Sequence, residues 1–166
     1  MLPDSGARRE FETGAVRDIQ EGKGRCDLMP LAVIGQIYKH VFEDDDTCEV
    51  FMKLADFQDT GLLICLVDAL DAFVRVSGYE AWSNMFLEVS KHFEEGALKY
   101  GEHNWQKGIP THCYIDSAVR HYLKWLREDN DEPHDRAFCW NILCCIWTCI
   151  HKPELNTYGK KEKSDG

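Results

Sequence analysis

Residues 92–110 read HFEEGALKYGEHNWQKGIP. The stretch begins as an amphipathic helix and then meets Gly101, Gly108 and Pro110, residue types that end helices and shape loops. Upstream, the same helix extends back to Tyr79. Its apolar side chains recur every three or four residues, at Trp82, Phe86, Val89, Phe93, Ala97 and Tyr100. This periodicity predicts a long helix with one buried face, followed by an abrupt loop.

Helical periodicity also accounts for most of the remaining chain. The other predicted helices cover about 28–42, 48–57, 62–76, 112–129 and 134–150. No alternating strand pattern competes with them. The predicted fold class is therefore all-α, a helical bundle of five to six helices with an irregular N-terminal arm.

The domain organisation follows from the same pattern. Residues 1–150 are predicted to form a single all-α domain. Within it, residues 1–27 are an irregular basic arm, because they lack apolar periodicity, and residues 39–78 are interpreted as a helical insertion. Residues 151–166, which include the charged run KKEK, are predicted to be a flexible tail.

The charge balance limits the kinds of partner. The 166-residue chain has a net charge of −10, whereas proteins that bind DNA or RNA need a basic surface for the phosphates. We therefore expect no nucleic-acid polymer as a partner. A small anion remains compatible with this composition if cations gather locally.

Cysteine usage and hydropathy predict a cytoplasmic protein. Four of the eight cysteines, Cys139, Cys144, Cys145 and Cys149, lie in one apolar run, at spacings that do not match a CxxC zinc pair. We interpret them as buried, reduced thiols. The N-terminal residues MLPDSGARREFE contain no signal peptide. The longest apolar run, CWNILCCIWTCI, is too short and too interrupted to span a membrane, so no membrane partner is expected.

Two adjacent acids on the 79–100 helix have different predicted surroundings. At 100° per residue, Glu94 falls on the flank of the apolar face, whereas Glu95 points away beside Lys91 and Lys99. A half-buried Glu94 needs a partner. That partner is either a hard cation such as Mg²⁺ or a neighbouring arginine.

The last helix carries a polar stripe of His134, Ala137, Asn141, Cys145 and Thr148 on an otherwise apolar surface. Such a stripe either bonds to other helices or lines a cavity. Asp131 and Glu132 precede this helix, where its N-terminus favours acidic groups. On the preceding helix, Asp116 and Arg120 are spaced as a salt bridge and His121 lies on another side.

The N-terminal arm contains a basic, glycine-rich loop. Arg17, Lys23 and Arg25 can approach a phosphate together with backbone N–H groups, although no GxxxxGK[ST] motif is present. With the acids and histidines above, these cations form a set that could hold a metal ion against a polyphosphate.

Several blocks of this sequence resemble the dATP/dGTP diphosphohydrolase N-terminal family, common in phage and prophage genomes and related to the all-α MazG-like nucleotide pyrophosphohydrolases. The blocks are RREFETGAVRD (8–18), GKGRCDLMPL (22–31), HFEEGALKYGEHNWQKGIP (92–110), DSAVRHYLKWL (116–126) and DEPHDRAFCWN (131–141). The resemblance implies a Mg²⁺-dependent enzyme that cleaves a (deoxy)nucleoside triphosphate to a monophosphate and pyrophosphate, with the metal activating water.

The resemblance and the residue patterns together give a candidate site. The catalytic candidates are Glu94 and Glu132, and the metal candidates are Glu94, Asp131, Glu132 and Asp135. The nucleotide-binding candidates are Arg17, Lys23, Arg25, Lys99, Tyr100, Asn104, Trp105, Arg120, His121, His134 and Asn141. Within this set, Trp105 is expected to stack on the base and Asn104 to hydrogen-bond to it.

The sequence departs from the MazG pattern, in which ExxE and ExxD pairs lie on facing helices. Neither pair occurs at the expected positions, and the segment from 39 to about 86 is longer. MazG-like bundles usually need a partner subunit to complete the site, so a homo-oligomer is expected. The alternative is a non-catalytic nucleotide-binding protein, such as a phage sponge for a nucleotide-derived immune signal. A purely structural helical protein leaves the unusual 99–110 run unexplained.

Overall fold

The structure, a computed structural model, describes residues 6–159. Its elements are β1 (Arg8–Glu10), β2 (Val16–Asp18), η1 (Cys26–Leu28), α1 (Leu31–Phe42), α2 (Asp45–Thr60), α3 (Leu63–Ser77), α4 (Trp82–Tyr100), η2 (Asn104–Lys107), α5 (Thr111–Leu126), α6 (His134–His151) and η3 (Pro153–Leu155). Six α-helices dominate, so the predicted all-α class is confirmed.

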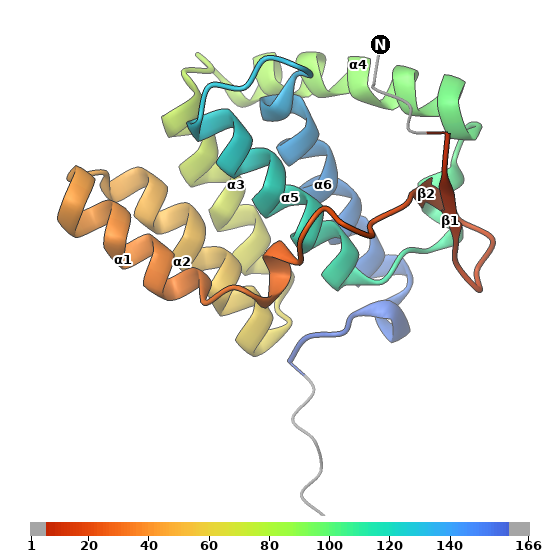
Figure 1. Cartoon of the computed structure of the whole chain (residues 1–166), viewed down its shortest axis with the longest axis horizontal. Coiled ribbons are helices and arrows are strands. Elements are labelled where there is room, and N and C mark those ends of the chain that lie inside the picture. Colours follow the sequence, from red (N-terminus) through yellow and green to blue (C-terminus); the bar gives the residue numbers. More distant parts are fainter. Residues whose placement is uncertain (1–5, 160–166) are drawn as a thin grey trace, which may run out of the picture.

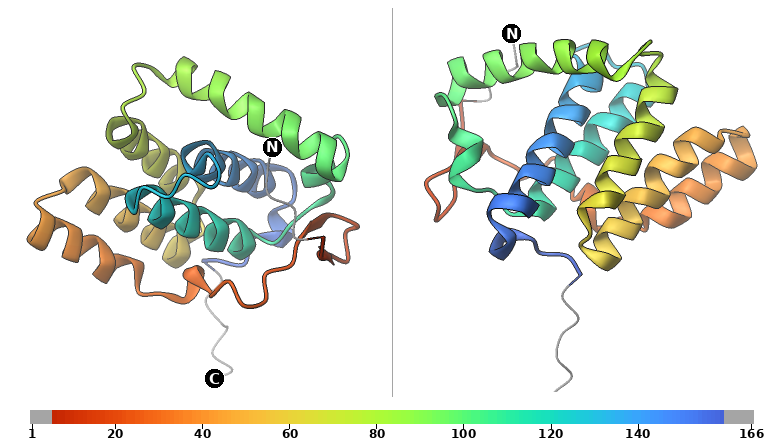
Figure 2. Two further views of the ribbon diagram at one scale, coloured as in Figure 1. Left: turned by 45° about the horizontal axis from the view of Figure 1, so that its top comes forward. Right: turned by 180° about the vertical axis from the view of Figure 1, so that it is seen from behind.

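The helices are arranged around the antiparallel pair α5 and α6 (Figure 1). Helices α1, α2 and α3 pack in sequence on one side, and α3 also contacts α6. Helix α4 crosses one end of this group, which Figure 2 shows from two further directions. The description as a helical bundle therefore applies to α1, α2, α3, α5 and α6, with α4 lying across their ends.

The core is continuous from α2 to α6. The ring of Phe73 on α3 contacts Tyr122 on α5 and Phe138 on α6, with centroids 5.6 and 4.5 Å apart. Tyr122 is fully buried and donates a hydrogen bond from its hydroxyl to Thr47 on α2 at 2.9 Å. Residues 39–78, interpreted as an insertion, thus contribute to the same core as the last two helices.

Local signals position the helix ends. The Asp44 side chain accepts a hydrogen bond from the backbone N–H of Thr47 at 2.9 Å and caps α2. Gly61 and Gly101, with φ of 68° and 91°, follow the last residues of α2 and α4, where a side chain would be strained. Gly35 lets α1 approach α2 closely, because an added Cβ would lie 3.1 Å from the Cys48 carbonyl oxygen.

The cysteines are free thiols, and Cys139, Cys144 and Cys145 are buried in α6. Burial raises the pKa of each of these three thiols. They occupy core positions as small apolar groups. No helix among residues 6–159 is both long and apolar enough to cross a membrane.

The N-terminal arm is more regular than the sequence indicates. Residues 8–18 form an antiparallel hairpin in which Arg9 pairs with Arg17 (Figure 1). The strands are three residues long and none of their residues is buried. They therefore lack the apolar alternation by which a strand is recognised, and the expectation that no strand forms was wrong here.

The chain end is also more ordered than expected. Within residues 151–159, Asn156 donates a hydrogen bond to the Gly61 carbonyl oxygen at 2.9 Å, and the Tyr158 ring packs edge-on against Phe57. These contacts attach part of the predicted tail to the bundle. Residues 160–166 lie outside the described residues.

Candidate functional site

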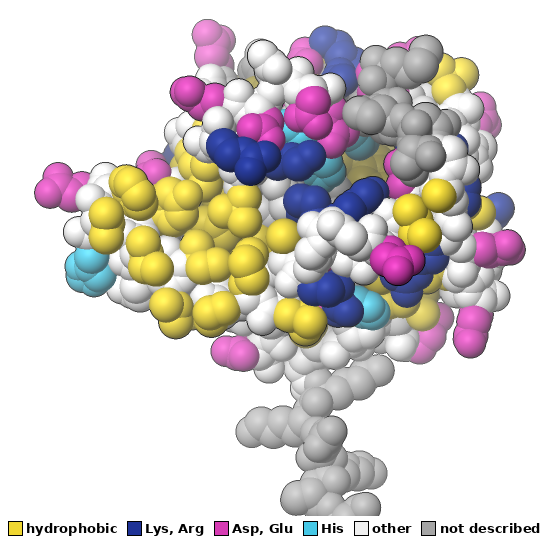
Figure 3. Space-filling model, in the orientation of Figure 1, with side chains coloured by type: hydrophobic (Ala, Val, Ile, Leu, Met, Phe, Trp, Pro, Cys, Tyr) yellow, Lys and Arg dark blue, Asp and Glu magenta, His cyan; other side chains and the backbone are white. Residues whose placement is uncertain are grey.

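A cavity of about 590 Å³ opens beside the hairpin, and its walls come from β2 and the loop after it, α4, η2, α5, the turn before α6, and α6 itself. Figure 3 shows Lys and Arg side chains bordering this hollow. The predicted site residues that line it are Arg17, Lys23, Lys99, Tyr100, Asn104, Trp105, Arg120, His121, Asp131, Glu132 and Asn141. The fold thus brings most of the candidate site together.

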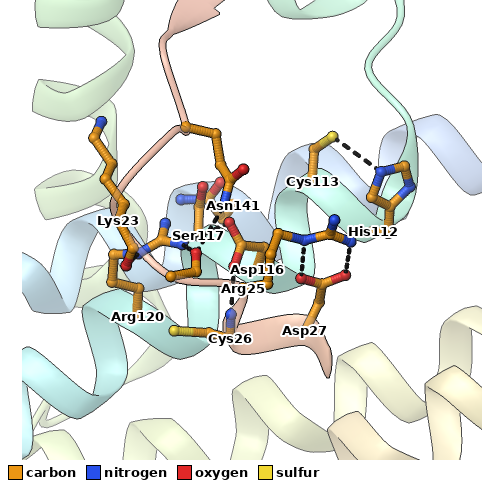
Figure 4. Close-up of polar contacts among 12 residues, drawn as sticks. Lys23, Arg25, Cys26, Asp27, His112, Cys113, Asp116, Ser117, Arg120 and Asn141 are labelled. Atoms are coloured by element: carbon orange, nitrogen blue, oxygen red, sulfur yellow. Dashed lines mark hydrogen bonds and ion pairs between the residues drawn. The ribbon is translucent and has the colours of Figure 1, made fainter. Parts of the chain in front are cut away.

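Four predicted site residues are not part of this lining; His134 lies directly behind it, and the other three lie elsewhere. Glu94 is exposed on α4. Asp135 accepts a hydrogen bond from the Tyr79 hydroxyl at 2.9 Å, away from the cavity. Arg25 forms a two-point ion pair with Asp27 at 2.8 and 2.7 Å (Figure 4) and borders a smaller recess. The geometry therefore does not place any of the three against a ligand in the main cavity.

The expected environments of Glu94 and Glu95 are reversed. Glu95 is the half-buried acid and pairs with Arg136 of α6 at 3.1 Å, whereas Glu94 faces solvent. The buried residues of α4 are Met85, Val89 and His92. The buried face is thus rotated by about one residue position from the predicted one, and this rotation brings Glu95 to Arg136 across the α4–α6 contact.

Arg17 on β2 is the most informative cation in the cavity. Its guanidinium donates to three neutral groups, namely the Cys113 carbonyl oxygen (3.4 Å), the Ser117 hydroxyl (3.2 Å) and the Asn141 side-chain oxygen (2.9 Å). It also lies over the rings of Tyr114 and Trp140. Among residues 6–159 no carboxylate forms an ion pair with it. Such a guanidinium, in a protein with net charge −10, is available to an anion.

Arg120 fixes the glycine-rich loop against the cavity (Figure 4). It donates to the Asp116 carboxylate at 2.6 Å and to the Gly24 carbonyl oxygen at 2.8 Å. Asp116 in turn accepts a hydrogen bond from the Cys26 backbone N–H at 2.6 Å. This arrangement holds Lys23 at the cavity rim. Partial burial lowers the pKa of Lys23, and the nearby guanidinium of Arg120 lowers it further, while Asp18 opposes both.

The cavity carries more positive than negative groups. Lys99 pairs with Asp18 at 2.8 Å, and Asp18 is shared with Arg8 at 3.0 Å. In total, the described lining contains five cations (Arg17, Lys23, Lys99, Arg120 and Lys124) and three carboxylates (Asp18, Asp131 and Glu132). The local excess is opposite in sign to the charge of the whole chain, which favours an anionic ligand.

An aromatic wall lies beside these cations. The Trp105 ring meets Phe93 and Trp147 with centroids 5.6 and 5.1 Å apart. Trp105, Tyr100 and Trp140 all line the cavity. Aromatic faces of this kind are suited to stacking with a flat heterocycle.

Two predicted ligand-binding asparagines, Asn104 and Asn141, line the cavity and also have partners within the protein. Asn104 is buried, its side-chain oxygen accepts from the Val16 N–H at 2.8 Å and its amide nitrogen donates to the Val16 carbonyl at 2.7 Å. Asn141 orients Arg17 and donates to the Ala137 carbonyl oxygen at 2.8 Å. Both asparagines therefore position other groups: Asn104 anchors β2, and Asn141 holds the guanidinium.

Two histidines and two acids lie close together where α5, the turn after it and the start of α6 border the cavity. His121 Nδ1 lies 3.0 Å from His134 Nδ1, and the Glu132 Oε1 atom lies 3.6 and 3.7 Å from these two nitrogens. His134 is 1% exposed and lies behind the lining, where its Nε2 bonds to Asp131 at 2.7 Å. Burial lowers the pKa of His121 and raises that of Glu132. This group, unlike Glu94 or Asp135, has the spacing to hold a metal ion.

Comparison with known proteins identifies the family. Residues 75–158 match the model of the family described as dATP/dGTP diphosphohydrolase, N-terminal, which covers half of the chain. The chain belongs to this family. A search of curated proteins and a search of solved structures each gave no significant match.

The region matching the dATP/dGTP diphosphohydrolase N-terminal family runs from Arg75, near the end of α3, to Tyr158, which follows η3. It supplies the aromatic wall, the histidine cluster, Lys99 and Arg120. Arg17 and Lys23 lie outside it, in the hairpin and the following loop. In this chain the cavity is therefore completed by a segment that the family match does not include. The family's name describes a hydrolase of dATP and dGTP.

The cavity residues that sequence reasoning missed include His92, Lys124 and Trp140. His92 and Trp140 were hidden within apolar helical faces, and their rings lie 5.6 Å apart. Lys124 lies 3.5 Å from Asp131 across the α5–α6 turn. The spacing of Lys124 one turn after Arg120 was the available signal for it, because residues four apart share a helix face.

Proposed function

We propose that this protein is a pyrophosphohydrolase that cleaves a dATP- or dGTP-like nucleoside triphosphate to a monophosphate and pyrophosphate. The observation that carries the proposal is the guanidinium of Arg17, which has only neutral partners among the described residues and faces a cation-rich cavity. A triphosphate supplies the missing negative charge. The family name indicates the same substrate class.

The cavity has room and chemistry for both ends of such a substrate. Its volume of about 590 Å³ lies within the roughly 300–1,000 Å³ typical of small-molecule sites. Arg17, Lys23 and Lys99 come from the hairpin side and from the end of α4, where they would bind phosphate oxygens. Trp105 stands in the aromatic wall as the stacking surface for the base.

A divalent cation supplies polarisation of phosphoryl oxygens and activation of water in such hydrolyses. The described carboxylates do not assemble the all-oxygen set that Mg²⁺ prefers, because Glu94 and Asp135 lie outside the cavity. Of the metal candidates only Asp131 and Glu132 line it, and two imidazoles adjoin them. The proposal accordingly assigns the carboxylate role to Glu132 and gives none to Glu94. The proposal includes a cytoplasmic location, expected from cysteine usage and hydropathy, and a phage or prophage source and a homo-oligomer, both expected from the resemblance.

The test is turnover and binding on purified protein with dATP and dGTP, with and without divalent cations. Chromatography of the products and calorimetry would be run on wild type, Arg17→Gln, Glu132→Gln and Glu94→Gln. We expect pyrophosphate release from wild type and Glu94→Gln. Arg17→Gln should weaken nucleotide binding about tenfold to a hundredfold, since a hydrogen bond to a charged group contributes about 1.5–3 kcal/mol.

The pair of Glu→Gln variants decides the catalytic assignment, because one acid lines the cavity and the other faces solvent. Loss of turnover in Glu132→Gln alone supports the proposal. Loss in Glu94→Gln alone would contradict the assignment of Glu132.

A second function, nucleotide capture without chemistry, is favoured by one observation. Five cations and an aromatic wall surround the cavity, but three converging carboxylates do not. Tight binding of dATP or dGTP that produces no pyrophosphate and is insensitive to EDTA would establish this binding function and reject the hydrolase.

A further inference from the structure

We propose that His121, Glu132 and His134 bind one first-row transition-metal ion of the Zn²⁺ or Co²⁺ type, in place of Mg²⁺. The metal site itself is independent of any substrate, whereas a catalytic role for the ion rests on the proposed function. Three features support the site. They are the spacing of the donor atoms, the carboxylate that bonds to the outer nitrogen of His134, and the open side toward the cavity.

The donor atoms have the spacing of a metal site. The three edges of the triangle formed by His121 Nδ1, His134 Nδ1 and Glu132 Oε1 are 3.0, 3.6 and 3.7 Å. Three atoms with these separations share a centre about 2 Å from each of them, which is the distance of nitrogen and oxygen ligands from zinc in proteins. One ion therefore fits between them without movement of the helices.

The outer hydrogen bond of His134 sets its ring for metal binding. Its Nε2 lies 2.7 Å from Asp131 Oδ1, and an ionised carboxylate only accepts hydrogen bonds. The proton is thus on Nε2, which leaves Nδ1 unprotonated and able to bind a metal ion. In many metal sites a carboxylate bonds to the outer nitrogen of a metal-binding histidine in this way and fixes the orientation of its ring.

The fold holds the three ligands on separate, packed elements. His121 lies within α5, His134 is the first residue of α6, and Glu132 lies in the turn between these two helices. His134 is buried at the back, whereas His121 and Glu132 line the cavity. Three protein ligands with one open side leave coordination positions for water or a phosphate oxygen, as in catalytic zinc sites.

The donor types select the class of ion. Imidazole nitrogen suits zinc, cobalt, nickel and related ions, whereas magnesium requires hard oxygen ligands. Without metal, one imidazole would donate an Nδ1–H to the other across the 3.0 Å gap. A metal site and a simple hydrogen-bonded histidine pair are distinguished by whether the protein binds the metal ion in the absence of nucleotide.

The test is a titration of the full-length, reduced protein with Co²⁺ in the absence of nucleotide, followed by visible absorption and calorimetry. We expect one Co²⁺ per chain, d–d bands without a thiolate charge-transfer band, displacement by Zn²⁺ and no displacement by excess Mg²⁺. His121→Ala and Glu132→Gln should weaken binding at least ~100-fold. Asp131→Asn should weaken Co²⁺ binding by about 10–100-fold, because the carboxylate that orients the His134 ring is lost.

The matched control is His40→Ala, which removes an exposed histidine from α1 and should bind Co²⁺ as wild type does. Circular dichroism of each variant shows that it is folded, and no variant of the buried His134 is needed. Absence of Co²⁺ binding, equal binding by wild type and His121→Ala, or a thiolate band would each overturn the proposal. Co²⁺ binding without nucleotide turnover would support the metal site and reject the hydrolase. Mg²⁺-dependent turnover without Co²⁺ binding would support the hydrolase and reject the metal site.

Discussion

His92 is a buried imidazole whose protonation links the stability of the fold to pH. Its residue is 7% exposed. Burial lowers its pKa to about 4, and the positive charges of Arg136 and Arg17 add to this shift, while Asp135 opposes it. The folded state therefore keeps His92 neutral at pH values where the unfolded chain, with a pKa of about 6.5, takes up a proton.

From this shift we predict a loss of stability in mild acid. Because the unfolded state binds the extra proton, the contribution of neutral His92 is complete above about pH 6.5 and is lost as the pH falls toward 4. The loss between pH 7 and pH 5 is about 2 kcal/mol for His92 alone. The lowered pKa of His121 acts in the same direction. Urea unfolding at the two pH values measures the sum.

His92→Phe should reduce this pH dependence, because the phenyl ring cannot take up a proton in either state. His40→Phe changes an exposed position and should leave the dependence intact. An unchanged loss of stability in His92→Phe would show that other groups cause it.

At the scale of elements, the N-terminal hairpin is attached to the bundle through Asn104. Both polar atoms of this buried side chain bond to the backbone of Val16 on β2, next to Arg17. Asn104 of η2 thus helps to hold the strand that carries the Arg17 guanidinium.

We predict that Asn104→Ala lowers the free energy of unfolding by about 1–3 kcal/mol, because two backbone groups of Val16 lose their partner. Nucleotide affinity should fall as well, since Arg17 loses its fixed position. Urea unfolding and calorimetry with dATP measure the two effects. Asn84→Ala, at an exposed site on α4, is the control. Reduced stability with unchanged affinity would mean that the hairpin does not position Arg17.

The helices were predictable from periodicity, but their rotation about their own axes was not. A helical wheel gives the angle between Glu94 and Glu95, whereas the partner of each acid depends on α6, which supplies Arg136. The hairpin was not predictable either, because its register depends on the distant Asn104 and its strands carry no apolar alternation. Both differences arise from contacts between segments far apart in the sequence.

At the scale of the whole molecule, residues 156–158, after α6, contact both α2 and α5. Thr111 at the start of α5 lies 3.1 Å from Thr157, through their hydroxyl groups, and Asn156 bonds to Gly61 at the end of α2. The Tyr158 ring packs on Phe57 with centroids 5.4 Å apart. The short segment after α6 therefore links two elements that are distant in sequence.

We predict that Tyr158→Ala destabilises the whole domain by about 2–3 kcal/mol, because it removes a half-buried aromatic ring from the Phe57 contact. The loss should appear in a single cooperative transition in thermal and urea unfolding. Phe42→Ala removes an aromatic ring that is 62% exposed at the end of α1, and it should change stability by less than about 0.5 kcal/mol. Equal losses of stability in the two variants would show that the Tyr158–Phe57 contact does not stabilise the domain.

The cavity residues were largely predictable because they lie in the unusual sequence blocks, but their roles were not. The sequence places Asn104 beside Trp105 without showing that Asn104 faces Val16 and not a ligand. Likewise, His121 and His134 belong to different helices, and only the packing of α5 on α6 brings their nitrogens within 3.0 Å. Residue type predicts what a side chain can do, and packing decides which neighbour it meets.

The distance in sequence between Arg17 and its partner Asn141, 124 positions, has a consequence for biosynthesis. A ribosome releases the hairpin first, yet the groups that hold it appear only with η2, α5 and α6. The contacts that hold Val16 and Arg17 therefore form in stages, first with η2, then with α5 and last with α6. The cavity is consequently complete only once α6 has been made, because Trp140 and Asn141 of that helix line it.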